Sequence, residues 1–293
     1  DGCYKTIGEA IANIPDGSTK RYVLTLKPGV VFREKVFLNR SKPFVTIMSG
    51  DPRNPATIVW NDTAATPGKD GKGPLGVDGS STVAVESDYF IAYGVVIKND
   101  AAASAKAGEA APALRVTGTK ATFYNCTVDG GHGALYDQRG LHYFKSSTIM
   151  GTIDFIFGAA KSLFEDCKIV STAKEAANVA KVPHRPGNAM DANAIPGEVG
   201  FSFKTCTGRT TGWPGLSFSH TPTSKRSLCP SSMTTGGTSN LTRGTYYADF
   251  KCFGSGYESS PTFPMQYDQA KSFIGTHSVS GDSWILSLPP PEE

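Results

Sequence analysis

One octapeptide of the sequence carries a carboxylate in a pattern that suits catalysis. In Gly151-Thr-Ile-Asp-Phe-Ile-Phe-Gly158, strand alternation predicts that Ile153, Phe155 and Phe157 share one face and that Asp154 lies on the other. An outward carboxylate on a rigid strand suits a catalytic nucleophile. The simpler interpretation is a solvated aspartate, or one bonded to a turn. Asp154 is the first candidate catalytic residue.

A histidine lies about one sequence repeat before this aspartate. Counting back 21 residues from Asp154 reaches Gly133, which follows His132. A histidine hydrogen-bonded to Asp154 would serve as general base for a water, and Asp154 would then orient the ring rather than attack. A lone histidine is more often structural, so both interpretations of His132 stay open.

The elements that must position these residues come from an internal repeat. Four segments match, Phe123-Tyr-Asn-Cys126, Phe144-Lys-Ser-Ser147, Phe164-Glu-Asp-Cys167 and Phe203-Lys-Thr-Cys206. Their leading phenylalanines recur after 21, 20 and 39 residues, the last being about two periods. Short alternating strands at this period, without helical patterns between them, predict a solenoid of stacked coils.

Stacking places equivalent residues in ladders along the solenoid axis. The four phenylalanines would form one ladder, and Cys126, Ser147, Cys167 and Cys206 another. Cys126 and Cys167 would lie two coils, or roughly 10 Å, apart. That is too far for a disulfide, so we interpret them as small buried residues. A pairing among Cys206, Cys229 and Cys252 stays open.

The ends of the chain predict a cap and no second domain. Ile7, Ala10, Ile11 and Ile14 have helical spacing, and Pro15-Asp-Gly ends the pattern, so a short N-terminal capping helix is expected. Residues 22–37 read as early coils, and no linker divides residues 1–293. We therefore predict one all-β domain.

Composition excludes several classes of function. The net charge is +3, 19% of residues are charged, and no dense Lys/Arg run suggests nucleic-acid binding. No apolar stretch approaches the roughly 18–20 residues of a membrane helix. A mildly basic chain is compatible with an acidic polysaccharide. The chain starts at Asp1, which is expected for a mature secreted protein. Four N-x-[S/T] tripeptides, which are acceptor sequences for N-glycosylation, also favour secretion.

The octapeptide resembles the G-T-[VI]-D-F-I-F-G signature of plant pectin methylesterases. Tyr4-Lys-Thr-Ile, Ala113-Leu-Arg-Val116 and Gly281-Asp-Ser-Trp284 match that family in order and spacing. The resemblance covers residues 1–170 and 245–291 and is poor over 172–243. It implies a right-handed parallel β-helix, and a secreted cell-wall enzyme that hydrolyses the methyl esters of pectin to pectate and methanol, without cofactor or metal.

The resemblance also implies a catalytic set, of which several members are replaced here. Asp154 corresponds to the family's nucleophile. The family's Y-Q-D-T-L-Y segment reads Gly131-His-Gly-Ala-Leu-Tyr136, so Gly133 replaces the general acid and His132 replaces an oxyanion glutamine. Ala110 replaces the other glutamine. Asp137 is interpreted as a turn residue rather than a substitute acid.

The remaining family positions carry over less directly. Thr207-Gly-Arg-Thr-Thr-Gly-Trp-Pro-Gly215 has the residue types of the family's L-G-R-[AP]-W segment at different spacing. This segment makes Arg209 a candidate partner of the nucleophile and Trp213 a candidate sugar contact. The simpler interpretations are an exposed arginine and a tryptophan packed in the protein. Tyr136 and Phe157 are the other candidate sugar contacts.

Two classes of function therefore compete. The first is a pectin methylesterase, weakened or rebuilt around His132; the second is a family member that binds pectin without cleaving it. Gly131-His-Gly133 superficially resembles polygalacturonases, but the paired N-T-D and D-D motifs do not occur. A calcium-dependent pectate lyase needs a carboxylate cluster, which we do not find in the sequence. We expect a shallow cleft across Asp154 and His132 and little esterase activity.

The expected partners follow from this family. They are methyl-esterified homogalacturonan and, as a further candidate, a proteinaceous pectinesterase inhibitor. No nucleic acid or membrane is expected. We expect a monomer in the cell wall or apoplast.

Overall fold

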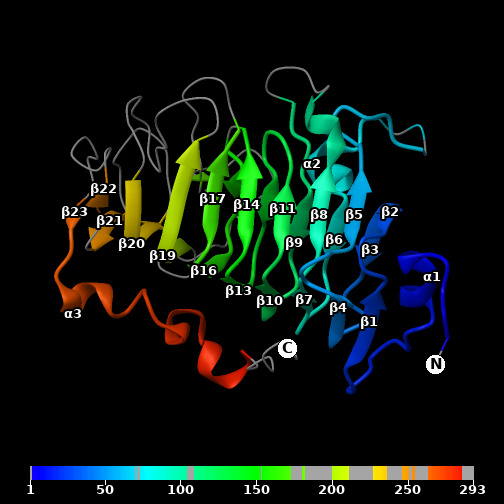
Figure 1. Cartoon of the computed structure of the whole chain (residues 1–293), viewed down its shortest axis with the longest axis horizontal. Helices are drawn as coiled ribbons and strands as arrows, with labels where there is room; N and C mark the ends of the chain where they lie inside the picture. Colours follow the sequence, from blue (N-terminus) through cyan, green and yellow to red (C-terminus); the bar gives the residue numbers. More distant parts are fainter. Residues whose placement is uncertain are drawn as a thin grey trace.

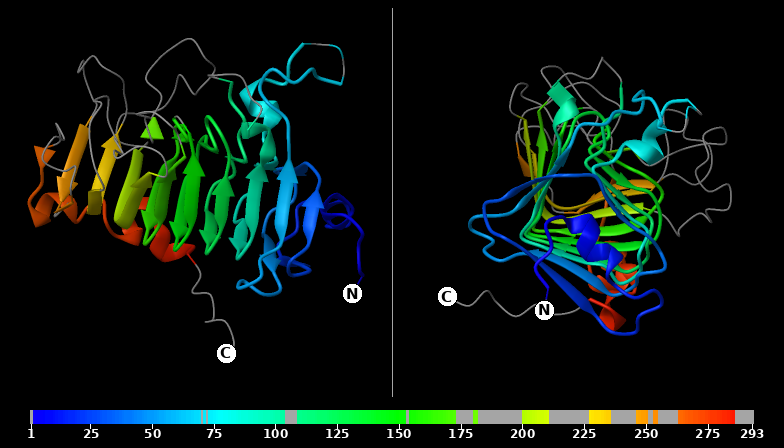
Figure 2. Two further views of the ribbon diagram at one scale, coloured as in Figure 1. Left: turned by 45° about the horizontal axis from the view of Figure 1, so that its top comes forward. Right: turned by 90° about the vertical axis from the view of Figure 1, so that its right-hand side faces the viewer.

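The computed structural model describes residues 2–69, 71, 73–103, 109–152, 154–172, 180–181, 200–210, 227–235, 246–250, 253–254 and 263–285. Short strands stack side by side along the long axis of the molecule, from the N-terminal coil to β19 (Figure 1). The view along that axis shows the coils superimposed around a common interior (Figure 2). This is the parallel β-helix that the repeat predicts.

Each complete coil contributes one strand to each of three faces, because the chain changes direction at three corners per coil. Face A holds β1 (Tyr22–Leu26), β4 (Val45–Ser49), β7 (Ile91–Tyr93), β10 (Ala121–Tyr124), β13 (Leu141–Lys145) and β16 (Lys161–Glu165). Face B holds β3 (Val36–Leu38), β6 (Val83–Val85), β9 (Leu114–Val116), β12 (Leu135–Asp137), β15 (Ile156–Phe157) and β18 (Ala180–Lys181). Face C holds β2 (Val31–Arg33), β5 (Thr57–Trp60), β8 (Val96–Asn99), β11 (Thr127–Asp129), β14 (Thr148–Gly151) and β17 (Lys168–Ser171).

The long strand β19 (Gly200–Thr210) pairs in parallel with both β16 and β17 and so continues faces A and C. Beyond it the pattern changes, since β20 (Ser227–Thr235) runs antiparallel to β19. The sheet ends with β21 (Tyr246–Phe250), β22 (Phe253–Gly254) and β23 (Phe263–Pro264).

The predicted phenylalanine ladder is confirmed inside face A. The parallel register pairs Phe123 with Phe144, Phe144 with Phe164, and Phe164 with Phe203. Their rings stack with centroids 4.7, 4.6 and 4.7 Å apart. All four side chains are at most 1% exposed, so each coil buries its apolar face only through its neighbours.

The cysteine ladder is also confirmed. Cys126, Cys167 and Cys206 are buried free thiols, and the Ser147 hydroxyl between them donates to the Phe123 carbonyl. Burial raises the pKa of Cys126 to about 12, which makes this thiol unreactive. Cys206 is a free thiol, so it is not paired with Cys229 or Cys252. A pairing between Cys229 and Cys252 stays a prediction, because the Cys229 side chain and Cys252 lie outside the described part of the structure.

The N-terminal end of the solenoid is capped as expected. Helix α1 (Ile7–Ala12) buries Ile7, Ala10 and Ile11. The Thr6 side chain accepts from the Glu9 amide, and the Glu34 carboxylate accepts from the amides of Ile7 and Gly8 at 2.8 and 3.0 Å. These bonds satisfy amides that have no partner within the helix.

The chain returns along the outside of face A near its end. Helix α3 (Tyr267–Ala270) and the 3₁₀ turns η3 (Thr276–Val279) and η4 (Gly281–Ser283) run along the lower edge of the solenoid in Figure 1. Val279 and Trp284 pack against Tyr143 and Leu163. The C-terminal match to the family thus corresponds to a segment that covers part of this face.

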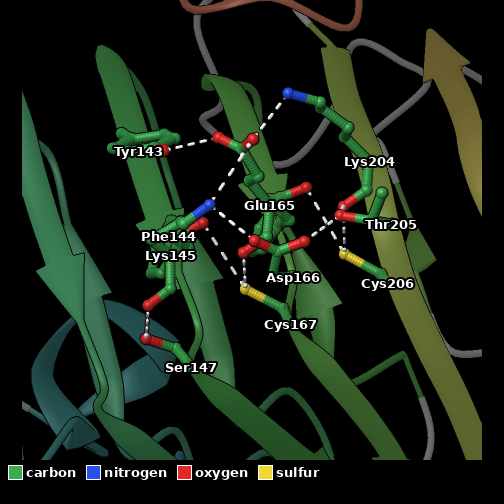
Figure 3. A network of polar contacts seen from close by, with 11 residues as sticks. Tyr143, Phe144, Lys145, Ser147, Glu165, Asp166, Cys167, Lys204, Thr205 and Cys206 are labelled. Carbon is green, nitrogen blue, oxygen red and sulfur yellow. Dashed lines mark hydrogen bonds and ion pairs between the residues drawn. The ribbon is translucent and has the colours of Figure 1, made fainter.

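A charged network lies on the outside of face A beside that contact (Figure 3). Glu165 accepts from the Tyr143 hydroxyl and the Lys204 ammonium, both at 2.5 Å. Burial alone would raise the pKa of Glu165, but these bonds outweigh it and leave that pKa below its usual value. Lys145 bridges Glu165 and Asp166, so three consecutive coils are tied together.

Two other helical segments lie in the loops between faces C and B. Helix α2 (Gly76–Ser80) precedes β6, and the 3₁₀ turn η1 (Asp100–Ala103) follows β8. The loop around α2 is held at its start, where the Lys35 ammonium contacts Asp62 at 2.6 Å. Helix α2 lies next to face B, because its Asp78 is 3.8 Å from Arg115 of β9.

Candidate active site

The outward side chains of face B form one row along the solenoid axis. The register pairs Phe37 with Ala84, Ala84 with Arg115, Arg115 with Tyr136, and Tyr136 with Phe157. The candidate catalytic positions lie just before these strands, at the corner where loops enter face B. Parallel stacking therefore brings residues about 21 positions apart in the sequence onto neighbouring rungs.

Asp154 lies in a bend before β15 rather than on the strand. Its φ is 43°, a left-handed conformation that aspartate tolerates better than most residues. This bend breaks the predicted alternation, so Phe155 and Ile156 both enter the core whereas Phe157 points outward. The prediction that Phe155 and Phe157 share one face is therefore wrong. The carboxylate is half-buried, with Oδ1 shielded from solvent.

The preceding rung carries Gly133, the position predicted to replace the family's general acid. Gly133 has a φ of +72°, and a Cβ built on it would lie 2.9 Å from a ring carbon of Phe157. No side chain can donate a proton from this position, and the Phe157 ring occupies the adjoining space. The Phe157 ring therefore adjoins the space that a side chain at position 133 would need.

The two positions predicted to replace the family's glutamines are direct neighbours. Ala110 and His132 form a parallel bridge between coils, and the Ala111 amide donates to the His132 carbonyl at 3.0 Å. On the other side, the Thr152 amide donates to the Gly131 carbonyl at 3.2 Å. The coil of His132 therefore lies directly between the coils of Ala110 and Asp154. The structure brings these three positions together, as the repeat predicts.

Tyr136 and Phe157, the two candidate sugar contacts on face B, differ in how far each ring is exposed. Tyr136 and Phe157 stack with centroids 4.4 Å apart and planes 6° from parallel. Tyr136 is only 4% exposed. Burial and the nearby Asp78 raise the pKa of Tyr136 above its usual value. The Tyr136 ring stacks on the half-buried Phe157 ring of the next rung and has little exposed surface of its own, and a sugar contact by either ring stays a prediction.

Asp137 is not the turn residue that the sequence suggested. It ends β12 with no exposed surface, and its carboxylate contacts His142 Nδ1 at 2.5 Å and the Ser162 hydroxyl at 2.5 Å. The His142 Nε2 contacts the Gly118 carbonyl at 2.8 Å. This buried network fixes the end of the strand that carries Tyr136. Its sequence signal was the alternation of Leu135, Tyr136 and Asp137, which places Asp137 inward.

The downstream candidates are only partly covered. Arg209 lies on β19 opposite Val170, where the structure describes its backbone. Trp213 lies outside the described residues.

Among the described residues, no group of three or more His, Cys, Asp or Glu side chains could hold a metal ion. No helix in the same part of the chain is long and apolar enough to cross a membrane.

The fold and this corner define a β-helix protein whose site is built from residues on successive coils. The family profile described as Pectinesterase matches residues 1–211. Pectinesterase QRT1 of Arabidopsis thaliana is 34% identical over 295 residues, covering 96% of this chain and 75% of the relative. This chain belongs to the pectinesterase family.

Solved structures agree with the fold. Pectin methylesterase from carrot has a TM-score of 0.60 and 26% identity, covering 72% of this chain and 60% of that one. Pectin methylesterase PemA from Erwinia chrysanthemi has a TM-score of 0.68 at 22% identity, covering 98% and 95%. The predicted right-handed parallel β-helix is confirmed.

Proposed function

We propose that this protein binds methyl-esterified homogalacturonan and releases little or no methanol from it. The observation that carries this proposal is Gly133. A glycine stands at the acid position, and the Phe157 ring adjoins the space that a side chain would need. A positioned general acid contributes roughly 10²–10⁴ in rate, and one oxyanion donor about 10²–10³. Replacing the acid and both glutamines therefore removes most of the family's route, although such losses do not simply add.

Binding is supported by what remains of the site. Phe157 presents a half-exposed ring backed by Tyr136, and a rigid aromatic face suits the apolar face of a sugar ring. Asp154 lies three residues before Phe157 in the chain, and its carboxylate would accept from a hydroxyl of a sugar ring. Trp213 would add a second aromatic contact, and Arg209 would partner Asp154.

The binding proposal is tested with Phe157→Ala. The variant should bind highly methylated pectin at least about ten-fold more weakly than the wild type, because it loses the ring that carries the contact. Tyr267→Ala is the matched control, since Tyr267 is 62% exposed on α3, away from face B. Equal binding by wild type and Phe157→Ala would refute the assignment of this site.

A second candidate function is a residual esterase built on His132, favoured by its place on the rung before Asp154. His132 would take a proton from water as the resulting hydroxide attacks the ester carbonyl carbon. The bond to the methoxy oxygen would then break, and the imidazolium would return the proton to form methanol. Methanol release by the wild type that is lost in both His132→Gln and Asp154→Ala would establish this route.

We further propose that the protein acts in the cell wall after secretion and as a monomer. The family membership supports the location. A proteinaceous pectinesterase inhibitor is a candidate partner, which co-elution of the two purified proteins would test.

A further inference from the structure

One exposed asparagine lies at the corner where face A turns into face C. Asn125 follows β10 and precedes β11, and it begins the tripeptide Asn125-Cys-Thr127, an acceptor sequence for N-glycosylation. Its φ is 49°, a left-handed conformation that asparagine adopts more readily than most residues. Among the described residues, none bonds to the Asn125 side chain, so its amide nitrogen faces solvent without a partner.

The neighbouring coils leave room around this side chain. The Tyr124 carbonyl accepts from the Gly94 amide, and the Lys145 carbonyl accepts from the Asn125 amide, both at 3.0 Å. Gly94 and Ser146 therefore hold the equivalent corner positions on the coils before and after Asn125. Gly94 has no side chain, and Ser146 is exposed and carries a small one. A bulky group on Asn125 Nδ2 would thus meet solvent rather than a neighbouring rung.

The acceptor tripeptide that begins at Asn39 is placed differently. Asn39 is half-buried, and its Oδ1 accepts from the amide and the hydroxyl of Ser41 at 3.0 and 2.7 Å. The same hydroxyl contacts the Asp16 carboxylate at 2.6 Å, and the Gly17 amide donates to the Ser41 carbonyl at 2.6 Å. This turn is packed against the loop that follows helix α1, which leaves less room for a glycan than the corner at Asn125.

The exposed acceptor positions lie at different corners of the solenoid. Asn61 is exposed on the loop that leaves β5 toward α2 and face B, whereas Asn240 lies outside the described residues. The strands of face C point upward in Figure 1, so loops toward face B leave from their upper ends. Asn125 precedes β11 and therefore lies at the lower end of that face. A glycan there would be directed away from face B.

We propose that Asn125 is an N-glycosylation site whose glycan points away from the candidate site. A lipid-linked oligosaccharide diphosphate of the secretory pathway is the donor. A C–N bond forms between Asn125 Nδ2 and C1 of the first N-acetylglucosamine, while the bond from C1 to the diphosphate oxygen breaks. The electron pair of that bond leaves with the diphosphate, and the amide nitrogen releases one proton. This inference rests on the proposed secretion, because the chain meets that donor only on the secretory route.

The test expresses the chain in plant cells behind a secretory leader and maps the peptides of the protein purified from the medium. Thr127→Ala removes the acceptor tripeptide but keeps Asn125, whereas Thr127→Ser keeps the tripeptide. The peptide that contains position 125 should carry a glycan in the wild type and in Thr127→Ser. Thr127→Ala should lose the mass of that glycan, and Asn39→Gln, as the control, should keep the wild-type mass.

Two results would overturn the site: secreted wild type with unmodified Asn125, or a loss of glycan mass in Asn39→Gln but not in Thr127→Ala. The peptide map of the wild type does not depend on any variant folding. Thr127→Ala with an unchanged circular dichroism spectrum should bind highly methylated pectin as tightly as the wild type, and altered binding would overturn the proposed direction of the glycan. A glycosylated wild type that binds no pectin would refute the pectin-binding function and support the modification site. Retention of the wild type in the cells would refute the proposed secretion and this inference with it.

Discussion

Removing the Asp137 carboxylate should destabilise the protein strongly, although this residue touches no ligand. Asp137 and His142 have no exposed surface, and the carboxylate satisfies both His142 Nδ1 and the Ser162 hydroxyl. A carbonyl oxygen only accepts, so His142 Nε2 carries the proton in its contact with Gly118. The Nδ1 atom of the same ring lies at hydrogen-bond distance from the Asp137 carboxylate. The interior thus holds a fully bonded polar group that has no access to water.

The magnitude follows from what Asp137→Ala leaves behind. The histidine nitrogen and the serine hydroxyl each lose a partner, which costs about 1–3 kcal/mol per buried group. Breaking one side of a buried pair typically costs about 3–5 kcal/mol in total. We therefore expect Asp137→Ala to lower the free energy of unfolding by about 3–5 kcal/mol. Asp137→Asn should cost less, because an amide retains one acceptor and nearly the same shape.

Urea unfolding followed by circular dichroism measures this loss, with Asp129→Ala as the control. Asp129 pairs with Lys98 on the surface of face C, and such exposed pairs contribute about 0.2–1 kcal/mol. If Asp137→Ala is no more destabilising than Asp129→Ala, the buried network does not stabilise the coil as described. A changed urea dependence in only one variant would indicate a changed unfolded state rather than a lost contact.

Three further outcomes are expected. Phe144→Ala should lower the free energy of unfolding by about 3–5 kcal/mol in the same urea assay, because the ring is fully buried between Phe123 and Phe164. Gly133→Asp should destabilise by about 1–3 kcal/mol and leave methanol release at the wild-type level, since φ is +72° and Phe157 adjoins the new side chain. Because the pKa of Glu165 is lower in the folded protein, its contribution is complete above its ordinary pKa of about 4.3 and is lost as the pH falls through the folded value. The thermal midpoint of Glu165→Gln should therefore fall less between about pH 6 and pH 3 than that of the wild type; equal falls would contradict this.

The ladders could be predicted from the sequence because they repeat. The phenylalanines recur at nearly constant spacing with alternating neighbours, and stacking is the only way for so short a coil to bury them. The same spacing placed Gly133 on the rung before Asp154, and the register of the flanking strands agrees. The capping helix could be predicted from Ile7, Ala10 and Ile11, because these residues recur at helical spacing.

The side-chain directions at the site were less predictable, because local backbone geometry overrides alternation there. The left-handed Asp154 turns Phe155 inward and Phe157 outward, and alternation alone cannot anticipate this. The environment of the Tyr136 hydroxyl includes Asp78, a residue of α2 that lies 58 positions earlier in the chain. The contacts of Asp137 depend on His142 and Ser162, which face A places beneath it. Such contacts are set by tertiary packing rather than by a motif.

The account is tested most directly by following one mixture of this protein and highly methylated pectin for both bound protein and released methanol. Co-sedimentation gives the bound fraction, and an alcohol assay gives the methanol formed per protein molecule. We predict saturable binding with methanol no higher than in a parallel mixture containing Asp154→Ala. Many methanol molecules per protein, lost in Asp154→Ala, would contradict the proposal and show that the site still hydrolyses its ester.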